Sequence, residues 1–279
     1  MNKFIIEGGN RLHGEISIPG AKNAVLPILA ATILNRGTSR IQNCPNLEDT
    51  KTMQEILMSL GLRVECDKQD IVVYGDTLSA NAIPESLAGK MRSSIVLMGA
   101  MLGRIGEIYI SYPGGCAIGP RPIDMHLNSL RKMGAEIDDL YKGILHCRVT
   151  RFQGTEILLD YPSVGATENI MLFAVGNPGK TTIYNPAREP EITDLQNFLN
   201  TCGFCVSGAG TGIITIEGKK VQNTDTVEYK IISDRIEAGT YLSAAASMKS
   251  KIYIRNIEKS HFKSITSLYE DAGCEIRET

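Results

Sequence analysis

The sequence lacks a long hydrophobic run. The longest apolar stretches, residues 24–34 and 95–102, are too short to span the hydrocarbon core of a bilayer. The first residues, Met-Asn-Lys-Phe-Ile-Ile-Glu, also lack the apolar core of a signal peptide. We therefore expect a cytoplasmic protein that does not enter the membrane.

The sequence also lacks a strong excess of charge of either sign. Its formal net charge is −2, and basic residues are not clustered with interleaved aromatics, so we expect no binding to nucleic acid. Its 279 residues are 43% hydrophobic and 22% charged, which is typical of a globular protein with room for two domains.

Cysteines are few, odd in number and scattered, which predicts free thiols in a reducing compartment. The seven are Cys44, Cys66, Cys116, Cys147, Cys202, Cys205 and Cys274. Only Cys202 and Cys205 have motif spacing. We interpret them as structural because the motif ends a predicted helix, whereas a redox pair begins one. Without a second pair or a nearby histidine, we expect no metal site.

An internal repeat of about seventy residues organises the chain. Its landmark is an apolar residue and a glycine, placed between a helical pattern and a short strand. The landmark occurs four times, as Leu60-Gly61, Met133-Gly134, Cys202-Gly203 and Ala272-Gly273. Glycine in this place predicts a left-handed cap that ends a helix.

Each unit contains strand, helix, strand, helix, strand and strand. In the first unit the pattern predicts helices over 21–34 and 48–60 and strands over 39–42, 63–65 and 71–74. The fold class is therefore α/β.

The second unit is about four residues longer than the others between its middle strand and its glycine. The extra length lies in residues 112–122, Tyr-Pro-Gly-Gly-Cys-Ala-Ile-Gly-Pro-Arg-Pro, and places Cys116 and Arg121 on a glycine-rich loop. Because loops tolerate insertions and carry binding groups, this loop is the best candidate for the chemistry. The thiol suits a nucleophile or an acid, and the guanidinium suits a phosphate contact. A surface cysteine without a function is the alternative.

Polar residues begin the first helix of each repeat. Lys22, Asn23 and Arg92 precede apolar helical patterns, and a cation beside free helix N–H groups makes an anion site suited to phosphate. Simple helix capping is the alternative for any single polar residue. His126 is either a base or a structural residue bonded to backbone.

These motifs resemble the UDP-N-acetylglucosamine 1-carboxyvinyltransferase family over the whole chain. The motifs are Ile-Pro-Gly-Ala-Lys-Asn-Ala at 18–24, Pro-Gly-Gly-Cys-Ala-Ile-Gly at 113–119, Arg-Pro-Ile-Asp-Met-His at 121–126, Ser-Val-Gly-Ala-Thr at 163–167, Arg-Glu-Pro-Glu-Ile at 188–192 and Asp-Arg-Ile-Glu at 234–237. The cysteine loop distinguishes this family from the shikimate-pathway enolpyruvyl transferases.

The resemblance implies transfer of the enolpyruvyl group of phosphoenolpyruvate to the 3-hydroxyl of UDP-N-acetylglucosamine, the first committed step of peptidoglycan synthesis, without a cofactor or metal. Cys116 would donate a proton, form the phosphoenolpyruvate adduct and react with fosfomycin, while Lys22 and Arg121 would hold the phosphate. The implied sugar-nucleotide contacts are Asn23, Arg92, Arg121, Pro122, Ile123, Asp124, Met125, Tyr161, Pro162, Ser163 and Val164.

The family has inside-out α/β repeats, six of them in two domains, whereas this chain holds three and most of a fourth. We expect residues 22–230 to form one complete three-repeat domain, and residues 1–21 with 231–279 to form a remnant of the second. The family's aspartate base has no matching position, so an inactive sugar-nucleotide-binding or regulatory protein is the alternative. We expect residues 3–8, which resemble 213–218, to pair with the unfinished fourth repeat, or that repeat to self-associate.

We predict that Cys116 is the most reactive of the seven thiols. A glycine-flexible loop with a nearby arginine and helix N-termini favours the thiolate. Brief alkylation followed by mass-spectrometric mapping tests this. Preferential labelling of Cys66 or Cys205 would contradict the assignment of the loop.

Overall fold

The structure is a computed structural model that describes residues 3–114, 122–140, 143–221 and 226–278. Its contacts divide the chain into two compact units. One unit consists of residues 22–231, and the other combines residues 1–21 with 232–279. Cys116 and Arg121 lie outside the described residues.

The first repeat has the predicted order of elements. It contains α1 (Lys22–Ala31), the 3-10 helix η1 (Thr32–Leu34), β2 (Thr38–Gln42), α2 (Glu48–Ser59), β3 (Arg63–Asp67) and β4 (Asp70–Tyr74). The prediction of two helices and three strands is confirmed, with helix ends that differ by a few residues.

The second and third repeats follow the same order. The second contains η2 (Gly75–Thr77), α3 (Glu85–Ala88), η3 (Arg92–Val96), α4 (Leu97–Arg104), β5 (Glu107–Ser111), α5 (Asp124–Lys132), β6 (Ala135–Leu140) and β7 (Ile144–Val149). The third contains β8 (Glu156–Leu158), α6 (Val164–Val175), β9 (Gly179–Tyr184), α7 (Pro190–Thr201), β10 (Cys205–Ser207) and β11 (Ile213–Gly218), followed by β12 (Val227–Lys230).

Each repeat forms an antiparallel sheet of three strands that accepts a parallel partner from the segment before it in the ring. The sheets have the orders β12-β2-β4-β3, β5-β7-β6 and β10-β11-β9-β8. Strand β12 pairs parallel with β2, β8 pairs parallel with β9, and Ala82 makes a parallel bridge to Tyr109 of β5. Because β12 follows the third repeat and joins the sheet of the first, it closes the unit.

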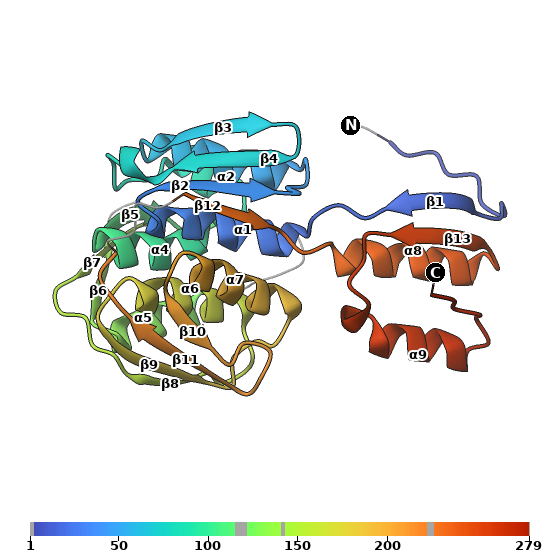
Figure 1. The fold of residues 1–279 in the computed structure, drawn as a ribbon. Helices are drawn as coiled ribbons and strands as arrows, with labels where there is room; N and C mark the ends of the chain where they lie inside the picture. Colours follow the sequence, from blue (N-terminus) through green and yellow to red (C-terminus); the bar gives the residue numbers. More distant parts are fainter. Residues whose placement is uncertain (1–2, 115–121, 141–142, 222–225, 279) are drawn as a thin grey trace. The chain divides into compact units, whose positions relative to one another are not determined.

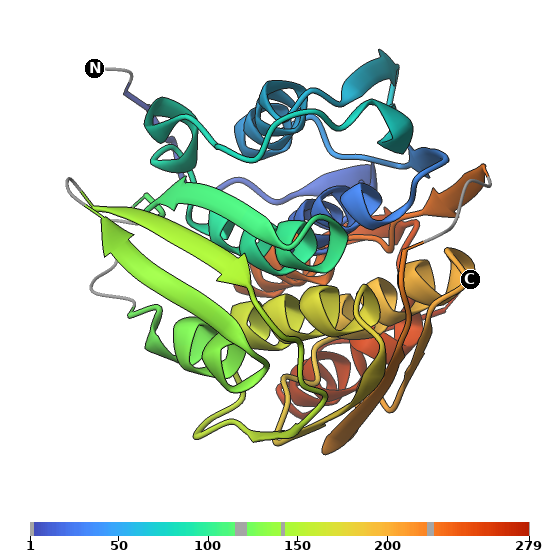
Figure 2. The same cartoon turned by 90° about the vertical axis from the view of Figure 1, so that its left-hand side faces the viewer.

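Three helices form the centre of this unit. Residues 24–31 of α1, 97–103 of α4 and 166–175 of α6 are buried on every side. Figure 1 shows the helices between the sheet containing β2 and the sheet containing β9, and Figure 2 shows the sheet of β5, β7 and β6 on a third side. The sheets therefore surround a helical core, as the α/β repeat prediction requires.

Helices α4 and α6 approach each other very closely. A Cβ atom at Gly99 would lie 2.3 Å from the carbonyl oxygen of Asn169, and one at Gly103 would lie 2.6 Å from that of Leu172. Glycine at these two positions permits the backbones to meet. The matching order of the two contact pairs also means that α4 and α6 run parallel, with their starts at the same end. Among the described residues, no helix combines the length and apolar character needed to cross a membrane.

The strand that lies between the two helices of a repeat in the sequence is called the middle strand here. An asparagine with positive φ follows it in three of the four repeats, at Asn43 (62°), Asn185 (56°) and Asn256 (56°). Each side-chain amide donates to the carbonyl of the residue that follows the parallel partner strand. The bonds run from Asn43 to Ile231 (3.1 Å), from Asn185 to Leu159 (3.0 Å) and from Asn256 to Ile18 (2.5 Å). The second repeat has Tyr112 after β5 instead.

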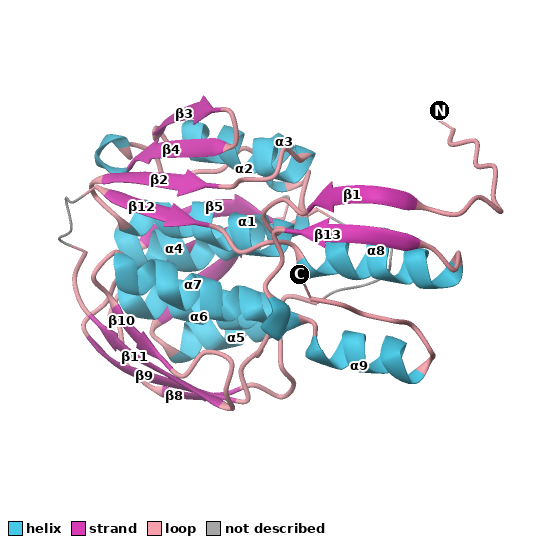
Figure 3. Cartoon of the chain, turned by 45° about the vertical axis from the view of Figure 1, so that its right-hand side comes forward, coloured by secondary structure: helices cyan, strands magenta, loops and turns pink. Residues whose placement is uncertain are grey.

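The other unit contains a parallel pair of strands and two helices. Strand β1 (His13–Ser17) pairs with β13 (Lys251–Arg255), beside α8 (Arg235–Ser247), η4 (Lys259–His261) and α9 (Lys263–Asp271), as Figure 3 shows. Its small core consists of Ile18, Ala238 and Phe262.

The expectation for residues 3–8 is wrong within this chain. They form no strand, and Phe4, Ile5 and Ile6 are 95%, 93% and 86% exposed. Instead, β1 occupies the parallel edge of β13, which is the place that β12 and β8 take in the complete repeats. A closing strand such as β11 pairs antiparallel with the other edge of a middle strand, and residues 3–8 do not reach that edge of β13. Self-association through the fourth repeat stays a prediction.

The landmark glycines have the predicted left-handed conformation, with φ of 88° at Gly61, 97° at Gly134, 82° at Gly203 and 89° at Gly273. Their surroundings differ. A Cβ atom at Gly134 would lie 2.0 Å from the carbonyl oxygen of Arg151, whereas at Gly203 the nearest atom, the Lys219 amine, is 3.8 Å away.

We predict that Gly134→Ala destabilises the protein more than Gly203→Ala. Both substitutions carry the left-handed penalty of about 1–2 kcal/mol, and Gly134→Ala adds a clash with backbone. Urea unfolding of both variants measures the difference. Equal losses of unfolding free energy would mean that the backbone contact at Gly134 has no energetic consequence.

Candidate functional site

The polar residues at the helix starts gather at one end of the helical core. The starts of α4 and α6 are linked by Asn169 of α6, which donates to the carbonyl of Ile95 at 3.0 Å. Helix α1 packs against η3, which precedes α4, and Leu34 at the end of η1 lies beside Gly103 near the end of α4, so α1 runs in the same direction. The positive ends of three helix dipoles therefore point toward the same side of the unit, which favours an anionic ligand there.

Lys22 and Asn23 begin α1 and are exposed, in contrast to the buried residues after them. The Lys22 amine lies 2.5 Å from a carboxylate oxygen of Asp49, in the first turn of α2. This ion pair holds the lysine side chain near its helix start.

Arg92 begins η3 and meets the segment that follows the cysteine loop. Its guanidinium donates to the carbonyl of Pro122 at 3.4 Å. Of the next residues, Ile123 is buried, whereas Asp124 begins α5 and is exposed. The structure therefore brings together two predicted site segments that are far apart in the sequence.

The segment 161–164 leads into α6. Tyr161 and Pro162 are exposed, and the Ser163 hydroxyl caps the helix by accepting from the amide of Ala166 at 3.4 Å. The capping alternative therefore holds for Ser163. Helix α6 packs against α5, which carries Asp124 and Met125.

His126 is a buried structural residue. Its Nδ1 lies 2.7 Å from the Asn169 amide nitrogen, and the Asn169 oxygen accepts from the Gly99 amide at 2.7 Å. Since that oxygen is the acceptor, the Asn169 nitrogen donates to Nδ1. Burial and the Arg92 charge lower the His126 pKa to about 4. The histidine is neutral, and its partner is a side chain rather than backbone.

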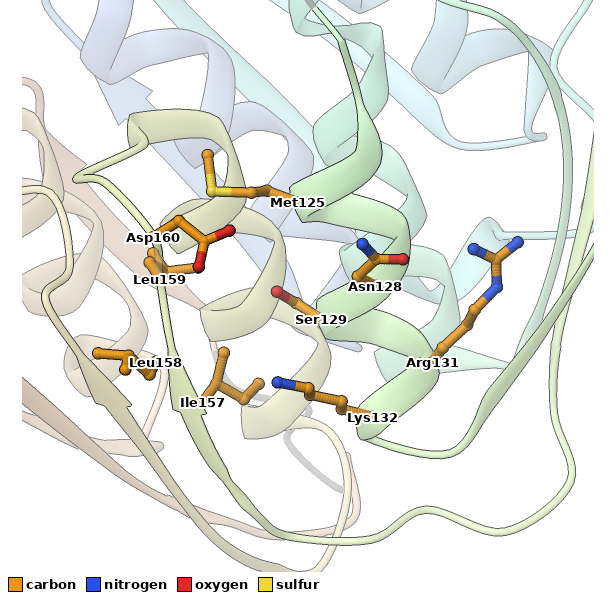
Figure 4. Close-up of a pocket in the computed structure, with 9 residues that line it drawn as sticks. All are labelled: Met125, Asn128, Ser129, Arg131, Lys132, Ile157, Leu158, Leu159 and Asp160. Atoms are coloured by element: carbon orange, nitrogen blue, oxygen red, sulfur yellow. The ribbon is translucent and has the colours of Figure 1, made fainter.

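A cavity of about 340 Å³ lies between α5 and β8 (Figure 4). It is lined by Met125, Asn128, Ser129, Arg131, Lys132, Ile157, Leu158, Leu159 and Asp160. Met125 belongs to the predicted sugar-nucleotide segment 121–125, and Asp160 directly precedes the predicted segment 161–164.

Comparison of the repeats explains this cavity. Ser129 stands five residues before Gly134, and the residue at the same place in the third repeat, five before Gly203, is Phe198. Ile157 stands two residues before Leu159, just as Tyr229 of β12 stands two residues before Ile231. Phe198 and Tyr229 pack edge to face with ring centroids 5.4 Å apart. The cavity therefore occupies the place of an aromatic pair.

Two buried glutamates lie at the starts of α6 and α7, although sequence reasoning did not select them as site residues. Glu168 is 5% exposed and Glu191 is 2% exposed. Burial, together with the charges of Glu191 and Glu189, raises the Glu168 pKa well above its usual value. A charged residue within the apolar stretch 164–175 is the signal that could have identified Glu168.

The other thiols differ in their surroundings. Burial raises the pKa of Cys44, Cys147 and Cys202 to about 12, whereas Cys66 and Cys205 are exposed. Cys202 follows α7 and Cys205 begins β10, so the pair does not lie at a helix start.

Comparison with known proteins identifies related sequences and folds. A model of the EPSP synthase (3-phosphoshikimate 1-carboxyvinyltransferase) family matches residues 6–279. UDP-N-acetylglucosamine 1-carboxyvinyltransferase 2 of Caldanaerobacter subterraneus subsp. tengcongensis is 52% identical over 278 residues, which are 99% of this chain and 66% of that protein. UDP-N-acetylglucosamine 1-carboxyvinyltransferase 1 of Symbiobacterium thermophilum is 47% identical over 281 residues, which are 99% of this chain and 63% of that protein.

Solved structures share the fold. The enolpyruvyl transferase NikO from Streptomyces tendae has a TM-score of 0.86 at 22% identity, and the match covers 98% of this chain and 65% of that one. EPSP synthase from Acinetobacter baumannii has a TM-score of 0.70 at 20% identity, over 91% of this chain and 57% of that one. The chain spans about two thirds of the length of the curated relatives that it matches.

We predict that Glu168→Gln stabilises the protein at pH 7. A raised carboxyl pKa means that the folded state binds the proton more tightly than the unfolded state. The unfolding free energy of the wild-type protein therefore falls as pH rises above the unfolded pKa of glutamate, about 4.3. The neutral amide avoids this loss. Urea unfolding should show the variant ahead at pH 7, with the difference shrinking as the pH falls and absent below about pH 4. A difference that is independent of pH would contradict the titration of Glu168.

Proposed function

The chain belongs to the EPSP synthase (3-phosphoshikimate 1-carboxyvinyltransferase) family, and we propose that it takes part in enolpyruvyl transfer from phosphoenolpyruvate to the 3-hydroxyl of UDP-N-acetylglucosamine. The names of the relatives that share about half of its residues support this substrate rather than shikimate phosphate. The cysteine-containing loop at residues 113–119 supports the same choice.

The proposed reaction is an addition followed by an elimination. The sugar hydroxyl gives its proton to a base as its oxygen adds to C2 of phosphoenolpyruvate, and a second proton goes to C3, which gives a tetrahedral intermediate. The bond from C2 to the phosphate oxygen then breaks and the new methyl group loses a proton, leaving inorganic phosphate and the enolpyruvyl ether. Cys116 supplies the proton in this proposal, because a thiol on a loop can approach the carbon.

Fixed positive charge has two uses in this reaction. It binds the anionic substrates, and it stabilises the charge that develops as phosphate departs. Lys22, at the positive end of the α1 dipole, and Arg121 are the proposed phosphate ligands. Asp49 holds the Lys22 amine at 2.5 Å, so a bound phosphate would share this lysine with Asp49.

The bond between Arg92 and Pro122 is the observation that carries the proposal. It joins the start of η3 to the proposed sugar-nucleotide segment 122–125, and α6 places the segment 161–164 beside the same helix α5. A nucleotide sugar needs donors for its diphosphate and a separate surface for its base and sugar. Arg92, with Asn23 and the two segments, supplies both kinds of contact.

Binding without turnover is the second candidate function. The chain spans 66% of the length of its 52% identical relative, and none of the residues proposed above accepts the sugar hydroxyl proton. A phosphate-release assay with both substrates distinguishes the candidates. Release of inorganic phosphate only when both substrates are present supports transfer, whereas binding of both without release supports the second candidate.

We predict that Lys22→Met and Arg121→Met each weaken phosphoenolpyruvate binding at least tenfold. A lost charge-assisted contact costs about 1.5–3 kcal/mol. Calorimetry with phosphoenolpyruvate measures the affinity. The matched control is Lys51→Met, which removes another exposed lysine whose amine pairs with Glu48 at 2.9 Å. Unchanged affinity in both site variants, or an equal loss in the control, would refute the phosphate role.

A further inference from the structure

The loop that carries the proposed sugar-nucleotide residues 161–163 is attached to the segment after β9. The Asn185 amide donates to the carbonyl of Leu159 at 3.0 Å, and the Leu159 amide donates to the carbonyl of Tyr184 at 3.1 Å. Both the main-chain carbonyl and the main-chain amide of Leu159 are therefore hydrogen-bonded just before the loop begins.

The other end of the loop is attached to the same segment. The Ala187 amide donates to the Thr167 hydroxyl oxygen at 3.1 Å, and that hydroxyl donates to the carbonyl of Ser163 at 2.8 Å. Residues 185–187 thus form a brace that contacts the chain before the loop and the helix turn after it. The span between the two attachments is only residues 160–162.

The exposed residues of this loop depend on those attachments. Tyr161 and Pro162 are exposed, so the directions of their side chains follow from where the ends of the loop are fixed. Loss of one attachment lengthens the free segment. A longer free segment has more conformations to give up when a ligand binds.

We propose that Asn185 is a positioning residue for sugar-nucleotide binding, acting through its hydrogen bond to Leu159 on the loop at residues 160–163. This inference rests on the proposed function for the identity of the ligand. Asn185 does not touch the ligand in this proposal. It lowers the entropy that the loop loses when the ligand binds.

A purely structural role is the competing explanation, because Asn43 and Asn256 make the same bond in their own repeats. Asn43 provides a matched control within the same unit. Its φ of 62° is close to the 56° of Asn185, and its bond to Ile231 is 3.1 Å long. Ile231, however, precedes none of the proposed ligand segments of this unit.

The test compares Asn185→Gly with Asn43→Gly. Glycine adopts the left-handed backbone without strain and removes only the side-chain amide. We expect similar small losses of stability in both variants. Calorimetry with UDP-N-acetylglucosamine should show Kd raised about threefold to tenfold in Asn185→Gly, the effect of one lost hydrogen bond, and unchanged in Asn43→Gly. If the wild type turns over, the KM for the sugar nucleotide should rise with little change in kcat.

Hydrogen exchange of the ligand-free proteins gives a second readout. The amide of Leu159, which donates to the carbonyl of Tyr184 at 3.1 Å, should exchange faster in Asn185→Gly than in the wild type and Asn43→Gly. A third variant, Asn185→Asp, guards against an effect of glycine flexibility, because aspartate also tolerates positive φ but cannot donate to Leu159 when ionised. It should reproduce the higher Kd.

Wild-type binding with an unchanged Kd in Asn185→Gly would overturn the inference, as would an equal loss in Asn43→Gly. Failure of the wild type to bind the sugar nucleotide would instead overturn the proposed function. In that case the exchange of the Leu159 amide still decides whether Asn185 holds the loop. Unchanged exchange would refute the positioning role.

Discussion

The attachment of β12 to two repeats at once is the constraint on which residues 22–231 depend. Its backbone pairs in parallel with β2 of the first repeat. Its Tyr229 hydroxyl donates to the carboxylate of Asp194 in the third repeat at 2.6 Å, and the Tyr229 ring packs on Phe198. Without this strand the first sheet would lose an edge and the third repeat would lose an aromatic partner. The closed arrangement of three repeats therefore depends on four residues that follow the third copy.

The common direction of the first helices explains why the proposed site residues share one end of the core. Each first helix follows a parallel partner strand along the chain. Hydrogen bonds to the neighbouring middle strand hold the residues at which the chain leaves that partner strand. Before α1 and α6 these bonds include an asparagine side chain, Asn256 at Ile18 and Asn185 at Leu159. The starts of α1, η3 and α6 then face the same side, and Lys22, Arg92 and Ser163 lie there. An anionic ligand at that side would meet three helix dipoles as well as two cations.

Sequence patterns predicted the elements of this fold well because a repeated pattern provides several independent observations of one unit. The four glycines with positive φ and the central apolar helices followed directly from the pattern. Contacts between repeats could not be predicted in the same way. The Asn169 bond to His126 joins α6 to α5, and its geometry depends on the close approach at Gly99, which no local pattern encodes.

The errors have similar causes. Residues 3–8 resemble a closing strand in composition, but strand formation needs a partner edge, and in this chain β1 pairs with β13 instead. The asparagines after the middle strands were available in the sequence as a repeated residue, yet their function became evident only from their positive φ and their carbonyl partners. The cavity beside α5 likewise required a comparison of Ser129 with Phe198 across repeats, in three dimensions.

Hydrogen exchange of the main-chain amides of β12 and β2 tests the closure of the three repeats most directly. Strand β12 lies at the edge of its sheet, so those amides of Val227–Lys230 that donate to β2 should be protected to a similar degree as the amides of Thr38–Gln42, because both strands belong to one cooperative sheet. Exchange of the β12 amides as fast as that of the exposed residues 3–8, while β2 and β4 remain protected, would show that the ring of repeats is open and would contradict this account.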